Sequence, residues 1–193
     1  MNRNGPPLDW RVCKNELEKI MHEDTKILDI GCNFGEKAHY LFNNCDLVLC
    51  DLERILRYDF ENFVQTSATN LPFADESFGV VTALHVIEHI KEDKAVLDEA
   101  YRVLKTNGVM LLVTPNKNRP SIIYTLLLKL FKRTKLRYPM NADHVFEYGR
   151  KDLEMLFGAS LFKVCKVSPI YARFSRLTRL DTLCDQYIVV AKK

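Results

Sequence analysis

The chain has 193 residues, of which 47% are hydrophobic, which is enough for one well-formed core and short for two. We therefore predict a single domain over residues 1–193. The 28 basic residues nearly balance the 25 acidic ones, so the net charge of +3 gives no general affinity for polyanions. The sequence has no apolar run of about 18 residues, no signal-peptide pattern and no CxxC pair among its six cysteines. These features predict a soluble, cytoplasmic protein with reduced thiols.

Apolar runs alternate with stretches of helical period, as in α/β folds. In chain order we expect a helix at 12–21, a strand at 26–30, a helix at 36–44, strands at 46–51, 63–67 and 79–85, a helix at 93–108 and a strand at 108–115. Asn107 and Gly108 are predicted to stop the long helix. The fold class predicted is a doubly wound, mainly parallel, seven-stranded sheet with helices on both faces and a helical insertion after the fifth strand.

The last third of the chain departs from this alternation. Residues 117–148 form the insertion, with an amphipathic helix expected within 121–137; a short helix at 149–158 and two strands at 161–172 and 185–193 follow, the last of them antiparallel. Basic residues gather in two sets, which are Lys129, Lys132, Arg133, Lys135 and Arg137, and then Arg173, Arg176 and Arg179. They fit a core-facing helix with a solvated basic side, peripheral membrane contact through 121–137, or binding of phosphates, with nucleic acid the less favoured partner.

The stretch ILDIGCNFGEK, residues 27–37, joins the first predicted strand to a helix through a turn that contains Gly31 and Gly35. Such a turn can cradle a nucleotide-like ligand at the carboxyl edge of a sheet, although the same spacing is also ordinary α/β punctuation. Asp51 follows Gly31 by 20 residues at the end of the second strand, where it can accept hydrogen bonds from a ribose. Glu36 occupies the place of the third glycine of GxGxxG, which argues against a dinucleotide.

S-adenosylmethionine fits this turn better than a dinucleotide. It carries an adenosine and an amino-acid tail without phosphate, and its sulfonium cation tolerates a nearby carboxylate such as Asp29. Asn33 stands where a middle glycine would, and asparagine is among the few residues that adopt a positive φ. The turn therefore remains buildable.

Four motifs resemble class I S-adenosylmethionine-dependent methyltransferases, of the small-molecule group that includes ubiquinone and menaquinone biosynthesis enzymes. ILDIGCNFG resembles the first motif, TSATNLPFADESFGVVTALHVIEHI the LPF-x-D-x-SFD stretch, EAYRVLKTNGVMLLVTPN the fifth-strand motif, and DHVFEYGRKDLEMLF a later element. The first three occur in the family's order over residues 27–116. We therefore expect the fold, the cofactor and the methyl-transfer activity of that family.

The resemblance implies roles for particular residues. The pocket for the methionine moiety would be shaped by Asp29, Gly31 and Gly35, and His85 would line the pocket. Asp51 would bind the ribose, Leu52 would pack on the adenine, and the adenine edge would be met by Ser67 and Ala68. Together with Asn33, these residues are the predicted cofactor-binding set. The sequence departs from the family at Asn33, at Ser67, where an aspartate usually contacts the adenine, and at Gly79, in place of the aspartate of SFD. The loss of a charged acceptor at 67 predicts weaker adenine binding.

The candidate catalytic residues are His144, His85 and His89. If residues 85–90 open a helix, His85, Glu88 and His89 share one face and, with His144, could form a base with its orienter or hold a divalent metal. A metal site would resemble that of the small-RNA 2′-O-methyltransferases, which carry E-x-x-E-H, TPN and DH-x-FE elements similar to those of this chain. His85 replaces their first metal-binding carboxylate, however, so no metal is predicted. Alternatively, Glu88 and His89 only cap the helix.

The sequence thus predicts methyl transfer from S-adenosylmethionine to a small or lipid-like acceptor, with oxygen favoured over nitrogen or carbon as the acceptor atom. A general base is needed when that acceptor is a protonated hydroxyl. The alternatives are a metal-assisted RNA 2′-O-methyltransferase and a non-catalytic adaptor that keeps the cofactor pocket. A third is a nicotinamide oxidoreductase on the same fold, which Glu36 argues against.

Overall fold

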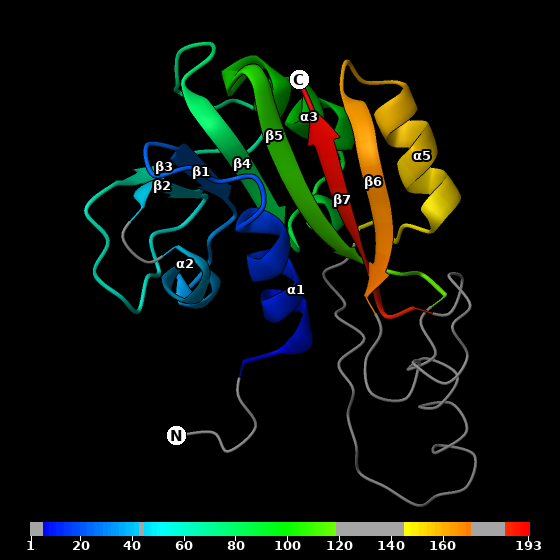
Figure 1. Ribbon diagram of the computed structural model, residues 1–193, viewed down its shortest axis with the longest axis horizontal. Coiled ribbons are helices and arrows are strands. Elements are labelled where there is room, and N and C mark those ends of the chain that lie inside the picture. The colour runs from blue at the N-terminus through cyan, green and yellow to red at the C-terminus, as the bar shows by residue number, and fades with distance from the viewer. Residues whose placement is uncertain (1–5, 43–44, 119–144, 171–183) are drawn as a thin grey trace, which may run out of the picture.

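The computed structural model describes residues 6–42, 45–118, 145–170 and 184–193. Its elements are α1 (Leu8–Leu17), β1 (Lys26–Ile30), α2 (Glu36–Leu41), β2 (Asp46–Asp51), β3 (Phe63–Gln65), β4 (Phe78–Leu84), the 3-10 helix η1 (Ile87–His89), α3 (Asp93–Val103), β5 (Leu104–Pro115), α5 (Arg150–Gly158), β6 (Lys163–Ile170) and β7 (Gln186–Lys192). The strands form one sheet in the order β3-β2-β1-β4-β5-β7-β6 (Figure 1). The predicted fold class is confirmed.

The sheet is parallel from β3 to β5, and β7 runs antiparallel to both β5 and β6. Strand β1 lies between β2 and β4, so that Asp29 is level with Leu49 on one side and Thr82 on the other. Because β1, β2 and β4 are parallel, their carboxyl ends meet at one edge of the sheet. The residues that follow these three strands are therefore neighbours in space.

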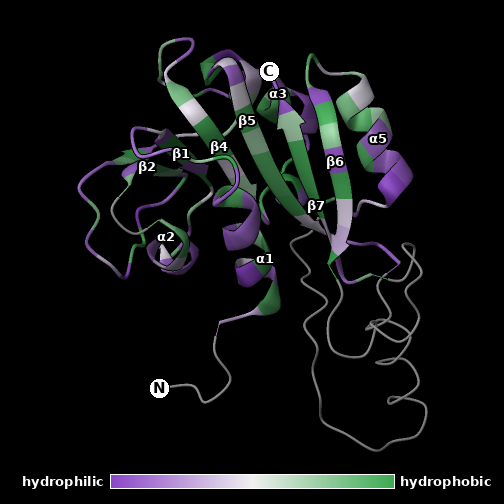
Figure 2. Ribbon diagram, viewed as in Figure 1, coloured by the Kyte–Doolittle hydropathy of each residue, from purple (hydrophilic) through white to green (hydrophobic). Residues whose placement is uncertain are grey.

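Helices cover both faces of the sheet, and the alternation of side chains along each strand decides which face they meet. Ile27 and Leu111 join the core with α1 and α2, whereas Leu28 and Leu112 join the core with α3 and α5. Both cores are made of buried apolar residues, which Figure 2 shows as green along β5 and β7. The expectation of a doubly wound sheet with near-continuous apolar strands holds for these elements.

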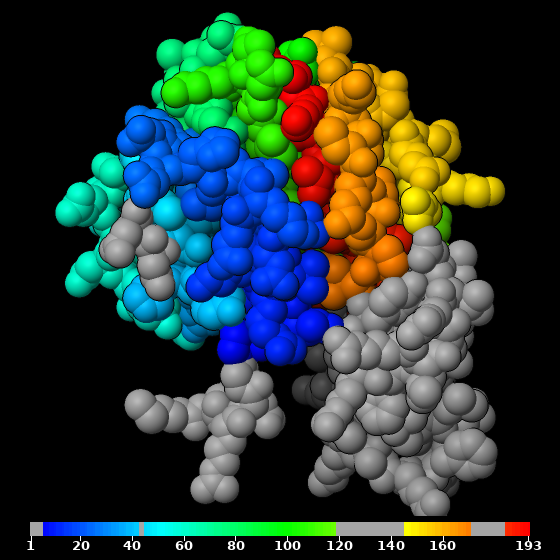
Figure 3. All heavy atoms as spheres, in the orientation of Figure 1, coloured from blue at the N-terminus to red at the C-terminus, as the bar shows by residue number. Residues whose placement is uncertain are grey.

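The first helix begins and ends four residues before the predicted range of 12–21. Cys13 and Leu17 are its buried residues and lie one turn apart, facing the sheet. On its outer side Glu16 accepts a hydrogen bond from Lys166 of β6 at 2.8 Å. Figure 3 shows this helix lying beside β6 on the surface of the molecule.

The predicted helix at 93–108 was too long, since α3 ends at Val103. Leu104 completes the apolar face of the helix pattern, but it pairs with Phe78 as the first residue of the long strand β5. Sheet pairing therefore overrides helix propensity over residues 104–107. Asn107 and Gly108 lie within β5 and do not stop the helix, although Asn107 has a positive φ of 66°.

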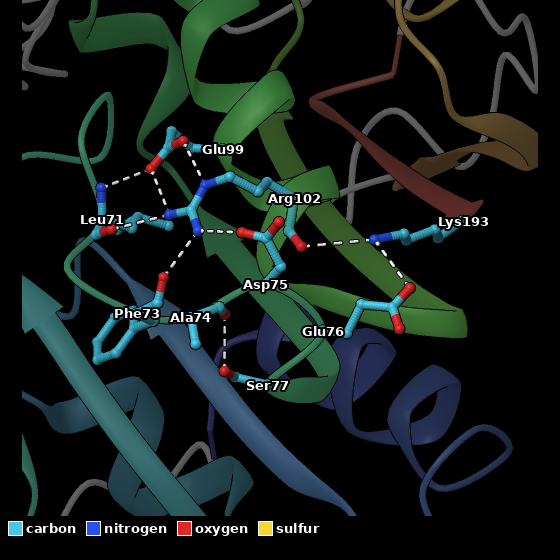
Figure 4. A network of polar contacts seen from close by, with 9 residues as sticks. All are labelled: Leu71, Phe73, Ala74, Asp75, Glu76, Ser77, Glu99, Arg102 and Lys193. Carbon is cyan, nitrogen blue, oxygen red and sulfur yellow. Dashed lines mark hydrogen bonds and ion pairs between the residues drawn. The ribbon is translucent and has the colours of Figure 1, made fainter.

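Arg102 on α3 fixes the loop that leads into β4 (Figure 4). Its guanidinium donates to Glu99, to Asp75 and to the backbone oxygens of Leu71 and Phe73, at 2.7 to 2.9 Å. Glu99 in turn accepts a hydrogen bond from the Leu71 backbone N–H at 2.7 Å. The E-x-x-R part of the fifth-strand motif thus holds the LPF-x-D loop in place.

Several predictions fall outside the described residues. These are the interior of the insertion, residues 119–144, with its expected amphipathic helix within 121–137, both sets of basic residues, and the candidate His144. Within the described ranges, no helix is both long and apolar enough to cross a membrane. All six cysteines lie in these ranges, and no disulfide joins any two of them.

Candidate cofactor and active site

The turn between β1 and α2 has three residues with positive φ, which are Gly31 at 68°, Asn33 at 50° and Gly35 at 77°. Asn33 therefore adopts the conformation that the sequence predicted for it. A Cβ atom on Gly31 would lie 2.4 Å from Cγ2 of Val86, so β1 and the chain after β4 approach too closely for any other residue. Gly31 and Cys32 donate backbone hydrogen bonds to Cys50, which ties the turn to β2.

Asp51 lies at the end of β2, with its carboxylate against this turn. One carboxylate oxygen accepts from the backbone N–H of Asn33 at 2.7 Å, and the other accepts from that of Leu52 at 2.7 Å. A carboxylate has about four lone-pair sites, so both oxygens can accept further bonds from a ligand. The side chain of Leu52, 66% exposed, extends from the same corner.

A cavity of about 630 Å³ lies at this edge of the sheet. Its lining combines the motif turn with the residues that follow β2, β3 and β4: Ile30, Gly31, Asn33, Cys50, Asp51, Leu52, Thr66, Ser67, Ala68, Thr69, His85, Val86, His89, Ile90, Lys91, Glu92 and Val145. Seven of the nine residues of the predicted cofactor set belong to this lining, as does the candidate His89. The other two, Asp29 and Gly35, lie behind it.

Ser67 uses its hydroxyl within the chain. Its Oγ lies 2.8 Å from the hydroxyl of Thr69 and accepts from the Thr69 backbone N–H at 3.3 Å, while its carbonyl accepts from Asn70. The hydroxyl thus closes a short turn at the cavity wall. This leaves the backbone of Ala68 as the neighbouring group for an adenine edge.

Asp29 is buried on β1, beside its register partner Thr82 on β4. Burial raises the pKa of this carboxyl to about 6, although the hydrogen bond from Thr82 at 2.5 Å and the charge of Lys37 favour the ionised form. Lys37 on α2 donates to the backbone oxygen of Leu84 at 2.8 Å, and burial lowers its pKa. The Asp29 side chain is therefore held by β4, within the sheet.

His85 does not open a helix, contrary to the prediction. It has a φ of 64°, and only residues 87–89 form a 3-10 helix, so the expected helical face of His85, Glu88 and His89 is absent. The His85 ring nevertheless lies between two carboxylates: Nε2 is 3.5 Å from Asp9 Oδ2, and Nδ1 is 3.4 Å from Glu88 Oε1. Glu88 is fully buried and its other oxygen accepts from Thr114 at 3.2 Å.

No sequence pattern indicated Asp9 or Lys37, because each reaches the cluster from a helix distant in the chain. Two residues of the TPN element make hydrogen bonds within the fold. Thr114 bonds to Glu88, while the Asn116 amide donates to the backbone oxygen of Cys184 at 2.8 Å. Gly79 lies at the opposite end of β4 from His85, so its departure from the family pattern does not touch the cavity.

Across the described ranges, no group of three or more His, Cys, Asp or Glu side chains is placed to hold a metal ion. The cavity fits an adenosine derivative better. It has the size of a small-molecule site, a carboxylate that can meet ribose hydroxyls, an exposed apolar side chain beside it and a close-packed glycine turn. Residues Gly31, Asn33, Asp51, Leu52 and Ala68 would hold such a molecule.

Comparison with known proteins agrees with this assignment. Residues 28–112 match the model of a methyltransferase domain. An uncharacterized protein of Methanocaldococcus jannaschii is 34% identical over 100 residues, which are 50% of this chain and 43% of that protein. The ubiquinone/menaquinone biosynthesis C-methyltransferase of Rickettsia typhi is 29% identical over 133 residues, with 58% of this chain and 54% of that enzyme covered. The chain thus spans about half the length of these curated relatives.

Among solved structures, a SAM-dependent methyltransferase of Methanosarcina mazei superposes with a TM-score of 0.66 at 20% identity, covering 92% of this chain and 96% of that one. This similarity establishes the fold. The chain has the fold of this methyltransferase, and its segment 28–112 matches a methyltransferase domain.

Proposed function

We propose that the protein transfers the methyl group of S-adenosylmethionine to a small or lipid-like acceptor. The observation that carries this proposal is the cavity at the carboxyl edge of β1, β2 and β4, because the residues that the family resemblance assigns to the cofactor line one continuous space there. The matched methyltransferase domain supports the same conclusion.

The chain's own residues have mainly a positioning task in this reaction. When bound, the cofactor supplies an electrophilic methyl on a sulfonium that is already an activated leaving group. Asp51 and the Asn33 turn would fix the ribose side. Orientation of the acceptor and exclusion of water then account for most of the acceleration.

Val145 lines the cavity, and Phe146 follows it in the chain. Both side chains are exposed and apolar, and their backbone N–H groups donate to the Glu88 carbonyl at 2.8 and 3.1 Å, which anchors this segment to η1. Exposed apolar side chains beside the cavity support an acceptor with hydrophobic character. The relative from Rickettsia typhi is named for quinone biosynthesis, which supports the same class of acceptor.

The acceptor atom is the second part of the proposal. The sequence favours oxygen, whereas the relative named a C-methyltransferase gives carbon as the second candidate. Incubation with methyl-labelled S-adenosylmethionine and a panel of phenols, hydroquinones and sterols tests both. Hydriodic acid releases the label from a methyl ether and leaves a carbon-bound methyl in place. Label on an RNA oligonucleotide, dependent on added divalent metal, would instead favour the 2′-O-methyltransferase alternative.

A further inference from the structure

The imidazole of His85 lies between two carboxylates, one from the distant residue Asp9 and one from Glu88, three residues further along the chain. Asp9 comes from the first turns of α1 and faces Nε2 at 3.5 Å, while Glu88 comes from η1 and faces Nδ1 at 3.4 Å. A neutral imidazole has one N–H and one acceptor nitrogen, so it can donate to only one carboxylate. Two carboxylates at these positions select the form with two N–H groups.

Backbone and burial keep this arrangement in place. Glu88 is fully buried, its second oxygen is held by Thr114, and the His85 backbone N–H donates to Val113 at 2.9 Å. The positive φ of His85 costs roughly 1 to 3 kcal/mol, and such strain persists only where the surroundings fix it. The ring is therefore a constrained feature of the cavity wall.

We propose that Asp9 is a positioning residue that, with Glu88, holds the His85 ring as an imidazolium between two carboxylates in the wall of the cofactor cavity. His85 then contributes a fixed positive charge and offers no nitrogen to accept a proton from the methyl acceptor. It follows that α1 belongs to the active site, and that a general base, where the acceptor needs one, is a residue other than His85.

The surrounding charges agree with this assignment. The charged and titratable groups of the cluster are Asp9 of α1, Asp29 of β1, Lys37 of α2, and Glu88 and His89 of η1. Burial and Lys37 oppose a charged ring, but the hydrogen bonds and charges of Asp9 and Glu88 outweigh them, so the pKa of His85 is raised above 6.5. The pKa values of Asp9 and Glu88 are lowered by the same contact, in spite of burial.

The direct test is an NMR titration of the His85 imidazole in the full chain without ligand, with its signals assigned by their loss in His85→Gln. The wild-type midpoint should lie above 6.5. In Asp9→Asn it should fall by about one pH unit, as expected when an opposite charge is removed at this distance. Asp9→Glu should restore the midpoint, and Asp24→Asn, an exposed carboxylate on the same N-terminal segment, should leave it unchanged.

A midpoint below 6.5 in the wild type, or the same midpoint in Asp9→Asn as in the wild type, would overturn the proposal. The first of these needs no variant, so the test survives a variant that fails to fold. Chemical-shift changes spread over the whole chain in Asp9→Asn, with the His85 midpoint retained, would show a merely structural role.

A second measurement rests on the proposed function. S-adenosylmethionine carries a positive sulfonium, and S-adenosylhomocysteine does not. An imidazolium in the cavity wall should therefore lower the affinity for S-adenosylmethionine alone. The affinity ratio should shift by about tenfold toward S-adenosylmethionine as the pH rises through the His85 midpoint, equivalent to one unit of coupling. In Asp9→Asn this shift should move to lower pH. If both ligands bind and the ratio of their affinities does not change with pH, only the charge assignment is contradicted. If neither ligand binds, the proposed function is contradicted, and the ligand-free titration still decides the role of Asp9.

Discussion

The carboxylate of Asp51 accepts a hydrogen bond from the backbone N–H of Asn33 at 2.7 Å, which ties the end of β2 to the left-handed turn after β1. One side chain therefore both shapes the turn and presents an acceptor to the cavity. Because Asp51 ends β2 and Asn33 lies in the turn that follows the adjacent parallel strand β1, the sheet brings the two residues together.

Asp51→Ala removes both the turn contact and the ribose acceptor. Hydrogen bonds to charged groups contribute about 1.5 to 3 kcal/mol, so the affinity for S-adenosylhomocysteine should fall by roughly 10- to 150-fold. The measurement is calorimetric titration. Asp46→Ala, an exposed aspartate at the other end of β2, is the matched control and should bind as the wild type does. Equal affinity in the two variants would remove Asp51 from the binding site.

Gly31→Ala tests the close approach of the turn to Val86. The new methyl group would lie 2.4 Å from a Val86 carbon and would stand on a residue with a φ of 68°. An alanine in that region costs about 1 to 2 kcal/mol before any clash. We expect a loss of at least about 2 kcal/mol in the free energy of unfolding, measured with urea.

Two variants separate the clash from the backbone strain at Gly31. Gly31→Ala combined with Val86→Ala should recover part of the loss relative to Val86→Ala alone. Gly158→Ala, at the end of α5 with open space around it, should change stability by less than about 1 kcal/mol. If Gly31→Ala is as harmless as Gly158→Ala, the description of the turn is wrong.

Asp29 should give the fold a pH dependence that Asp29→Asn abolishes. Its pKa in the folded state is about 6 and lies above the ordinary value of 3.8, so the folded protein binds more protons between these values. Stability should therefore decrease as the pH rises from about 4 to 6, by up to roughly 3 kcal/mol at about 1.4 kcal/mol per pKa unit. The stability of Asp29→Asn relative to the wild type should rise over the same window.

Urea denaturation at several pH values measures this difference, and subtraction of the two curves cancels all other titrating groups. Asp24→Asn, an exposed aspartate, should show a curve parallel to that of the wild type. A curve for Asp29→Asn that is also parallel would mean that Asp29 does not titrate in this window.

Arg102→Met should loosen the loop of residues 71–77 and destabilise the protein by about 1 to 3 kcal/mol, because partly buried acceptors lose a charged donor. Lys94→Met removes an exposed ion pair with Asp98 one turn away, and should cost at most about 0.5 kcal/mol. Urea denaturation compares the two variants. If both variants lose similarly little free energy of unfolding, the Arg102 network does not stabilise the fold.

The sequence predicted the parts of the fold whose signals are local. Each parallel strand is a short apolar run, and the turn after β1 carries its glycines and Asn33 within a few residues, so both were located correctly. Asp51 could be placed at the same edge because parallel strands end together. These features need no knowledge of distant contacts.

The errors arose where distant contacts decide the structure. Leu104 suits the α3 pattern as well as a strand, and only its pairing with Phe78 assigns it to β5. His85 was expected at the start of a helix, but it has a left-handed conformation and its backbone N–H donates to the Val113 carbonyl. Its contact with Asp9 joins two segments far apart in the chain, and no spacing in a single sequence indicates such a pair.

The most direct test of the account is calorimetric titration of the wild-type protein with S-adenosylmethionine and S-adenosylhomocysteine, with NAD as the control. The account predicts micromolar binding of the first two and no binding of NAD, because Glu36 stands where a dinucleotide fingerprint needs glycine and the cavity is built around Asp51. Absence of binding by both sulfur compounds, or binding of NAD in their place, would contradict it.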